Sequence, residues 1–121
     1  MSASWEFRLS TQIRFGCGML SKLSQTILPW GRRIFWVGYR TPAGLEAAYE
    51  KVRQQASASG LAVLEFFEVD GEPEVSLVER GVEAARAFGA EVVLGVGGGS
   101  VLDTAKAVAG LACMGGRLEQ F

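Results

Sequence analysis

The chain of 121 residues is 49% hydrophobic and 21% charged, which is the balance of one ordinary globular domain. Its 12 Lys and Arg residues and 13 Asp and Glu residues are dispersed, and the net charge of −1 argues against nucleic acid or an anionic membrane as a partner. Because the sequence contains no histidine, it excludes catalytic triads with a histidine base and the commonest zinc sites.

The first residues have the pattern of short strands. Residues 5–9 and 12–15 alternate apolar and polar side chains, which predicts an N-terminal β-hairpin or meander. A helical pattern follows over residues 20–28. Gly16 and Gly18 before it are similar to a dinucleotide-binding turn, but the acidic residue that such a turn needs about 20 positions later is missing. We interpret these glycines as a structural turn.

The middle of the chain alternates strands with a helix. Residues 33–37 form a continuous apolar run, typical of a strand buried on both faces. Thr41 and Pro42 predict the start of a helix, with Thr41 as N-cap and Pro42 at the first helical position, and Gly60 ends it. Residues 61–67 predict the next strand. The residues expected on the inner face of the helix are Leu45, Ala48, Tyr49, Val52 and Ala56.

The last third of the chain repeats this alternation. Pro73 and Glu74 are expected to open a helix that Gly89 ends, followed by a buried strand over residues 91–96 and a helix over residues 101–114. The inward residues of the first of these helices are expected to be Val75, Val78, Val82, Ala85 and Phe88. The last helix is apolar nearly all round, so we expect it to pack against the sheet on one side and against further protein on the other.

Strands that alternate with helices predict an α/β fold. We expect a Rossmann-like, doubly wound and mostly parallel sheet with helices on both faces, together with the N-terminal β-hairpin. The sequence has no internal linker, no leader-like start and no stretch long enough to span a bilayer. Its two cysteines lack Cys-x-x-Cys spacing, so we expect a cytoplasmic protein with reduced thiols.

Three consecutive glycines and a serine separate the last predicted strand from the last helix. Gly97, Gly98, Gly99 and Ser100 precede a helix N-terminus, where unpaired N–H groups and the helix dipole favour an anion. Glycine has no Cβ and therefore lets a phosphate oxygen approach the backbone closely. We interpret this glycine turn (residues 97–100) as a binding site for the diphosphate of a dinucleotide. A structural turn, which would need fewer glycines, is the alternative.

Residues 97–106 read Gly-Gly-Gly-Ser-Val-Leu-Asp-Thr-Ala-Lys. This motif after a buried strand resembles the nucleotide-binding signature of the iron-containing (group III) alcohol dehydrogenases, and residues 14–18 and 71–73 resemble other parts of the family more loosely. The members are NAD(P)-dependent, metal-dependent oxidoreductases and are much longer than this chain. The resemblance implies that residues 1–121 are the N-terminal dinucleotide-binding domain of a longer two-domain enzyme.

The resemblance also implies roles for single residues. By it, Gly99, Ser100 and Asp103 contact the cofactor, and Thr104 belongs to the same motif. A carboxylate facing the diphosphate would repel it, so a ribose hydroxyl is the sensible target of Asp103. Stabilising the first turn of the helix through its charge is the alternative for this residue.

The end of the strand at residues 33–37 departs from the family pattern. Many members have an aspartate there that accepts hydrogen bonds from the ribose 2′-OH, whereas this chain has Gly38, Tyr39 and Arg40. Arg40 could accommodate a 2′-phosphate, and Tyr39 could stack on adenine. This slightly favours NADP over NAD as the cofactor, with a solvent-facing Arg40 as the alternative.

The resemblance implies a divalent metal, iron or zinc, held by an aspartate and histidines of a separate helical domain that this sequence does not contain. Hydride transfer between the cofactor and an alcohol- or aldehyde-type substrate would then need residues outside the 121-residue chain, so we expect no catalytic or metal-binding residues in it and no activity from it alone. A stand-alone nucleotide- or phosphate-binding module without catalysis is the alternative. A truncated domain should aggregate or form a homodimer through its last helix, whereas a module should be monodisperse.

Overall fold

The computed structural model describes residues 16–114 of the chain. Along the chain they form the 3₁₀ helix η1 (Met19–Lys22), α1 (Leu23–Ile27), β1 (Arg33–Tyr39), α2 (Glu46–Ala58), β2 (Ala62–Val69), α3 (Val75–Phe88), β3 (Val92–Gly95) and α4 (Gly99–Met114). The predicted N-terminal β-hairpin lies outside the described residues. Within them, no helix combines the length and the apolar character that crossing a membrane requires.

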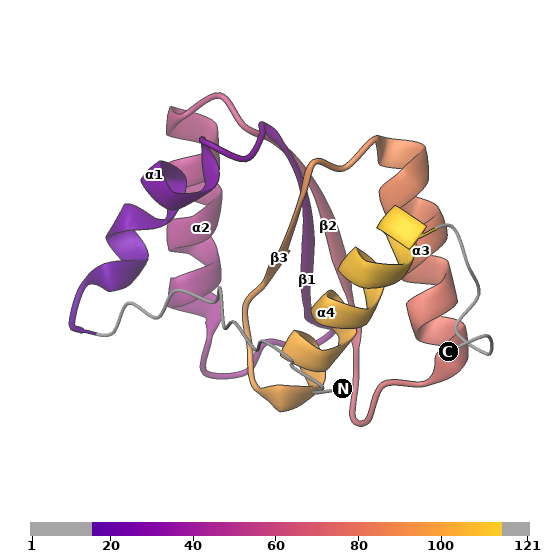
Figure 1. Ribbon diagram of the computed structural model, residues 1–121. Helices are drawn as coiled ribbons and strands as arrows, with labels where there is room; N and C mark the ends of the chain where they lie inside the picture. The colour runs from indigo at the N-terminus through magenta and orange to yellow at the C-terminus, as the bar shows by residue number, and fades with distance from the viewer. Residues whose placement is uncertain (1–15, 115–121) are drawn as a thin grey trace, which may run out of the picture.

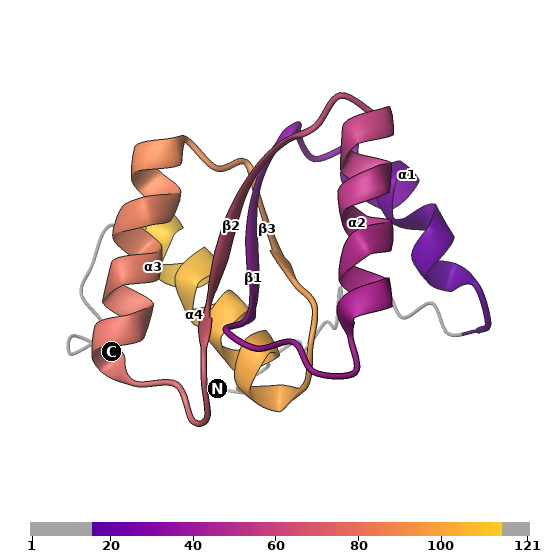
Figure 2. The same ribbon diagram turned by 180° about the vertical axis from the view of Figure 1, so that it is seen from behind.

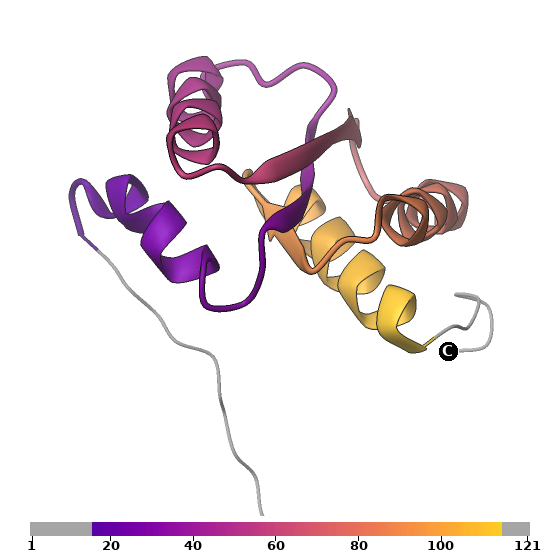
Figure 3. The same cartoon turned by 90° about the horizontal axis from the view of Figure 1, so that it is seen from above.

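The strands of the described residues form one parallel sheet in the order β2-β1-β3. The central strand β1 is buried over residues 34–38, as its continuous apolar run predicted. Helices α1 and α2 cover one face of the sheet, and α3 and α4 cover the other (Figure 1; Figure 2). Seen from above, the sheet lies between these two helical layers (Figure 3). The predicted α/β fold with a parallel sheet and helices on both faces is confirmed.

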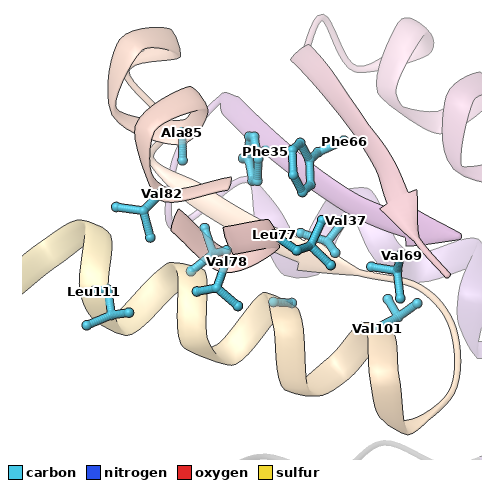
Figure 4. Packing of buried hydrophobic residues seen from close by; sticks show 12 residues of the cluster. Phe35, Val37, Phe66, Val69, Leu77, Val78, Val82, Ala85, Val101 and Leu111 are labelled. Carbon is cyan, nitrogen blue, oxygen red and sulfur yellow. The ribbon is translucent and has the colours of Figure 1, made fainter. Parts of the chain in front are cut away.

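Each face of the sheet has its own hydrophobic cluster, because successive side chains of a strand point to opposite faces. On one face, Phe35 of β1 belongs to the larger cluster, which packs between the sheet, α3 and α4 (Figure 4). On the other face, the neighbouring Trp36 packs with Tyr49 and Val52 of α2. Phe35 and Trp36 are both 0% exposed, so β1 anchors both halves of the core.

The start of α2 differs from the prediction. Thr41 and Pro42 do not cap this helix, because α2 begins at Glu46 with Leu45 as its N-cap residue. Gly44 has a φ of 83°, a left-handed conformation that no helix interior allows, and the chain makes a turn before the helix begins. The inner face of α2 is otherwise as expected, with Tyr49, Val52 and Ala56 buried.

The starts of α3 and α4 are also displaced. Glu74 has extended backbone and serves as the N-cap of α3, so Pro73 and Glu74 are not helical. Val75 is 44% exposed, contrary to the prediction, and Leu77 is buried. Helix α4 begins at Gly99, two residues earlier than expected, so the last glycine of the turn is its first residue. The helix ends at Gly60 and Gly89 agree with the prediction, since both glycines have left-handed φ.

The strand β3 lies at one edge of the described sheet and is half-buried throughout, whereas a buried strand was predicted. Its neighbour α4 packs against it closely. A Cβ on Gly95 would lie 2.9 Å from Cβ of Ala105, so this glycine allows the helix to approach the strand. The exposed side of α4 includes Leu102, a residue that is 42% exposed.

Candidate functional site

The topology of the sheet singles out one place for a ligand. From β1 the chain passes through α2 to β2 on one side, and it then crosses through α3 to β3 on the other side of β1. The carboxyl ends of β1 and β3 are therefore where the strand order reverses. Open α/β sheets bind ligands in the crevice outside such a switch point. Tyr39 is the last residue of β1. The glycine turn lies in the connection from β3 to α4 (Figure 1).

The three glycines of the turn have different surroundings. A Cβ on Gly97 would lie 2.7 Å from Cγ2 of Val101 and 2.8 Å from Cε2 of Tyr39. A Cβ on Gly98 would lie 2.8 Å from Oη of Tyr39. A Cβ on Gly99 would have no atom of the described residues within 4 Å. A side chain at Gly97 or Gly98 would therefore collide with Tyr39, whereas the flank of Gly99 is open among the described residues.

The N-terminus of α4 presents backbone donors at the same place. Leu102 N–H donates to the carbonyl oxygen of Gly98 at 3.0 Å, which closes the first turn of the helix. The N–H groups of Gly99, Ser100 and Val101 precede that bond and have no partner one turn earlier in the helix. With the helix dipole they favour an anion, and the open flank of Gly99 leaves room for a phosphate oxygen. These residues fit the diphosphate of a dinucleotide.

Two tyrosines hold the glycine turn against the end of β1. Tyr49 of α2 is 1% exposed. Its hydroxyl accepts from Tyr39 N–H at 3.1 Å and donates to the carbonyl oxygen of Val96 at 2.6 Å. Tyr39 Oη in turn accepts from Gly98 N–H at 2.8 Å. Its neighbour Gly38 is needed here, because a Cβ on it would lie 2.8 Å from Tyr49 Oη. Helical spacing identified Tyr49 as a core residue, but nothing local revealed what its hydroxyl binds.

Burial raises the pKa of the Tyr49 phenol above its ordinary value, although the hydrogen bond from Tyr39 N–H acts in the opposite direction. The protonated phenol therefore stabilises the fold fully below the ordinary tyrosine pKa of about 10, and this contribution is lost as the pH rises through the higher folded pKa. We predict that wild-type stability falls more steeply above pH 10 than that of Tyr49→Phe, which has no phenol at this site. Urea unfolding at a series of pH values measures this, and equal slopes for the two proteins would contradict it.

The other predicted site residues of α4 differ in how accessible they are. Ser100 is half-buried, and Asp103 is exposed on the first turn of α4. Thr104 is 0% exposed, and its hydroxyl donates to the carbonyl oxygen of Ser100 at 2.7 Å. Thr104 therefore lies on the buried side of α4, away from the open flank of the turn, whereas Asp103 is accessible. Within residues 16–114, no group of His, Cys, Asp and Glu side chains could hold a metal ion.

Arg40 lies at the same edge of the sheet but faces acidic neighbours. Its guanidinium is 3.8 Å from a carboxylate oxygen of Asp70, and the two side chains are 62% and 74% exposed. The open cleft next to it is lined by two arginines and four carboxylates, of Arg40, Arg80, Glu68, Asp70, Glu72 and Glu74. Arg80 is itself paired with Glu68 at 3.2 Å. This surface carries an excess of negative charge.

Comparison with known proteins adds to this geometry. Residues 10–121 match the family model described as iron-containing alcohol dehydrogenase. A probable NADH-dependent butanol dehydrogenase of Bacillus subtilis is 32% identical over 99 residues, which is 82% of this chain and 26% of that protein. NADH-dependent butanol dehydrogenase B of Clostridium acetobutylicum is 31% identical, over 87% of this chain and 27% of that protein.

Solved structures of iron-containing alcohol dehydrogenases are similar to this chain as well. An iron-containing alcohol dehydrogenase from Thermotoga maritima superposes with a TM-score of 0.85 at 29% identity, over 97% of this chain and 33% of that one. The NADH-dependent butanol dehydrogenase A of the same organism gives a TM-score of 0.79 at 34% identity, over 88% of this chain and 27% of that one. The chain thus spans about a quarter of the length of the curated relatives that it matches.

Proposed function

The chain belongs to the iron-containing alcohol dehydrogenase family, and we propose that it forms the dinucleotide-binding domain of an NAD(P)-dependent alcohol dehydrogenase-type oxidoreductase. In this proposal the diphosphate of the cofactor binds the glycine turn, with the N–H groups of Gly99 and Ser100 as donors. Asp103, exposed beside them, binds a ribose hydroxyl. The open space at Gly99 carries the proposal, because the packing of the described residues gives no other reason for a glycine there.

The chemistry of the whole enzyme follows from the family and rests on parts outside this sequence. A bound nicotinamide dinucleotide supplies or accepts the hydride. The residues of this chain bind and orient that cofactor at the switch point of the sheet. They do not fit a metal, since the sequence has no histidine and the described residues have no cluster of ligands. We therefore place the family's metal, and the binding of an alcohol- or aldehyde-type substrate, in the remaining length that the relatives have.

For the choice of cofactor we infer NAD(H) in place of the NADP(H) that Arg40 had suggested. A 2′-phosphate carries close to two negative charges, and the cleft beside Arg40 has more carboxylates than arginines. The guanidinium is also already paired with Asp70. A ribose 2′-OH adds no charge and avoids this repulsion. The printed names of the two butanol dehydrogenases, which specify NADH, support the same preference.

We predict that the protein binds NADH about tenfold more tightly than NADPH, because like charges repel at this edge. Titrations followed by nicotinamide fluorescence measure both dissociation constants. The variant Asp70→Asn removes one negative charge and the ion-pair partner of Arg40. In this variant the ratio of the NADPH and NADH dissociation constants should be smaller than in the wild type. Tighter binding of NADPH by the wild type would contradict the inference. Absence of binding for either nucleotide would contradict the proposed function itself.

A further inference from the structure

The side chain of Tyr39 lies directly on the glycine turn. Its ring edge contacts Gly97, where a Cβ would come within 2.8 Å of Cε2. Its hydroxyl oxygen accepts the N–H of Gly98 at 2.8 Å. The ring also packs against the larger hydrophobic cluster, and the backbone N–H of Tyr39 is held by the Tyr49 hydroxyl. The position of the Tyr39 hydroxyl is therefore fixed from several directions.

The hydroxyl of Tyr39 still has a donor to offer. A phenol has one O–H donor and acceptor lone pairs, and the bond from Gly98 uses an acceptor. Within residues 16–114, the structure shows no acceptor for the hydroxyl proton. The N–H groups of Gly99 and Ser100 follow Gly98 directly, and consecutive Cα atoms are only about 3.8 Å apart. The hydroxyl oxygen, 2.8 Å from Gly98 N, therefore lies beside the residue that directly precedes the donors of α4.

We propose that the Tyr39 hydroxyl is a direct ligand of the cofactor diphosphate, accepting from Gly98 N–H and donating its own proton to a phosphate oxygen. This inference rests on the proposed function of the glycine turn. A hydroxyl that accepts a hydrogen bond becomes a better donor, and a bond to a charged phosphate is stronger than one between neutral groups. Tyr39 thereby extends the row of donors from the backbone of α4 to the end of β1.

Two other roles for Tyr39 would require different properties of its ring and its hydroxyl. Stacking on adenine, which the sequence suggested, needs a free ring face and no hydroxyl. A gate that blocks Gly98 N–H until the cofactor displaces it needs a mobile ring, whereas this ring is packed against the core and against Gly97. The hydroxyl role uses the ring where it lies. The roles therefore differ in what removal of the hydroxyl alone does to affinity.

The test compares Tyr39→Phe, which removes only the hydroxyl, with Tyr39→Leu, which also removes the ring, in the protein at its natural length. Isothermal titration with NADH gives the dissociation constants, and urea unfolding gives the stability. For Tyr39→Phe we expect about tenfold weaker binding with a nearly unchanged unfolding midpoint, because water can replace the hydroxyl on the exposed Gly98. Tyr39→Leu should bind no more tightly than Tyr39→Phe.

If Tyr39→Phe binds NADH as tightly as the wild type, the inference is overturned. If, in addition, Tyr39→Leu binds NADH more weakly than both, the ring of Tyr39 stacks on the cofactor. Tighter binding by Tyr39→Phe would also overturn it, because that result identifies the hydroxyl as a competitor of the cofactor. If the wild type does not bind NADH at all, the proposed function fails first, so the two failures are distinguishable.

Discussion

Replacing Gly97 with alanine is expected to lower the free energy of unfolding by about 3 kcal/mol, which is in the upper range for overpacking a core. The new Cβ would lie 2.7 Å from Cγ2 of Val101 and 2.8 Å from Cε2 of Tyr39. Val101 is 0% exposed and belongs to the larger cluster, so it has no space to move into. Tyr39 is held by its bonds to Gly98 and Tyr49. Either the turn or the start of α4 must shift.

Urea unfolding of Gly97→Ala and the wild type measures this loss. The matched control is Gly99→Ala, two residues along the same turn, where the added Cβ meets nothing among the described residues. That variant should unfold at the wild-type concentration of urea or slightly above it, since alanine favours a helix over glycine. Equal stability of the two alanine variants would show that the packing of Tyr39 and Val101 on Gly97 is not as described.

Replacing Gly99 with valine is expected to weaken the binding of NADH by roughly 100-fold while leaving the fold intact. The side chain would occupy the open space in which we place a phosphate oxygen. Losing hydrogen bonds from the N–H groups of Gly99 and Ser100 to a charged phosphate costs about 3 kcal/mol, which corresponds to that loss of affinity. Fluorescence titration with NADH measures the affinity, and circular dichroism verifies the fold.

The choice of Gly99 matters for this experiment. A valine at Gly98 would also reduce binding, but its Cβ would lie 2.8 Å from Tyr39 Oη, so the loss could come from a displaced tyrosine. A substitution at Gly99 distinguishes a blocked phosphate site from a displaced Tyr39, because a Cβ on Gly99 would meet no atom of the described residues. If Gly99→Val binds NADH as tightly as the wild type, the diphosphate does not bind where we propose.

Local patterns in the sequence predicted the alternation of strands and helices and the position of the glycine turn. Continuous apolar runs and glycines at helix ends are signals within a few consecutive residues, so they can be recognised without knowledge of the tertiary structure. Helix starts were less predictable. Thr41 and Pro42 have the residue types of a cap, but the left-handed Gly44 interrupts the chain before α2 begins at Glu46.

The contacts that shape the candidate site join residues distant in sequence and could not be predicted from local patterns. Tyr39 binds Gly98 across 59 positions, and Tyr49 binds Val96 across 47. Sequence reasoning assigned the three glycines to phosphate binding, and it could not reveal that Tyr39 also packs on Gly97 and Gly98. The acidic neighbours of Arg40 come from β2 and the turn after it. The residues around Arg40 in the sequence give no sign of them.

The central claim is that the backbone of the glycine turn holds the diphosphate of a nicotinamide dinucleotide. A ¹⁵N–¹H NMR titration of the protein with NAD⁺ tests it most directly, because it reports on each backbone N–H separately. We predict that the largest shifts occur at Gly99 and Ser100, and that the turn at Gly60, at the opposite end of the sheet, does not respond. Saturable shifts confined to other residues, or no shifts at millimolar NAD⁺, would contradict the claim.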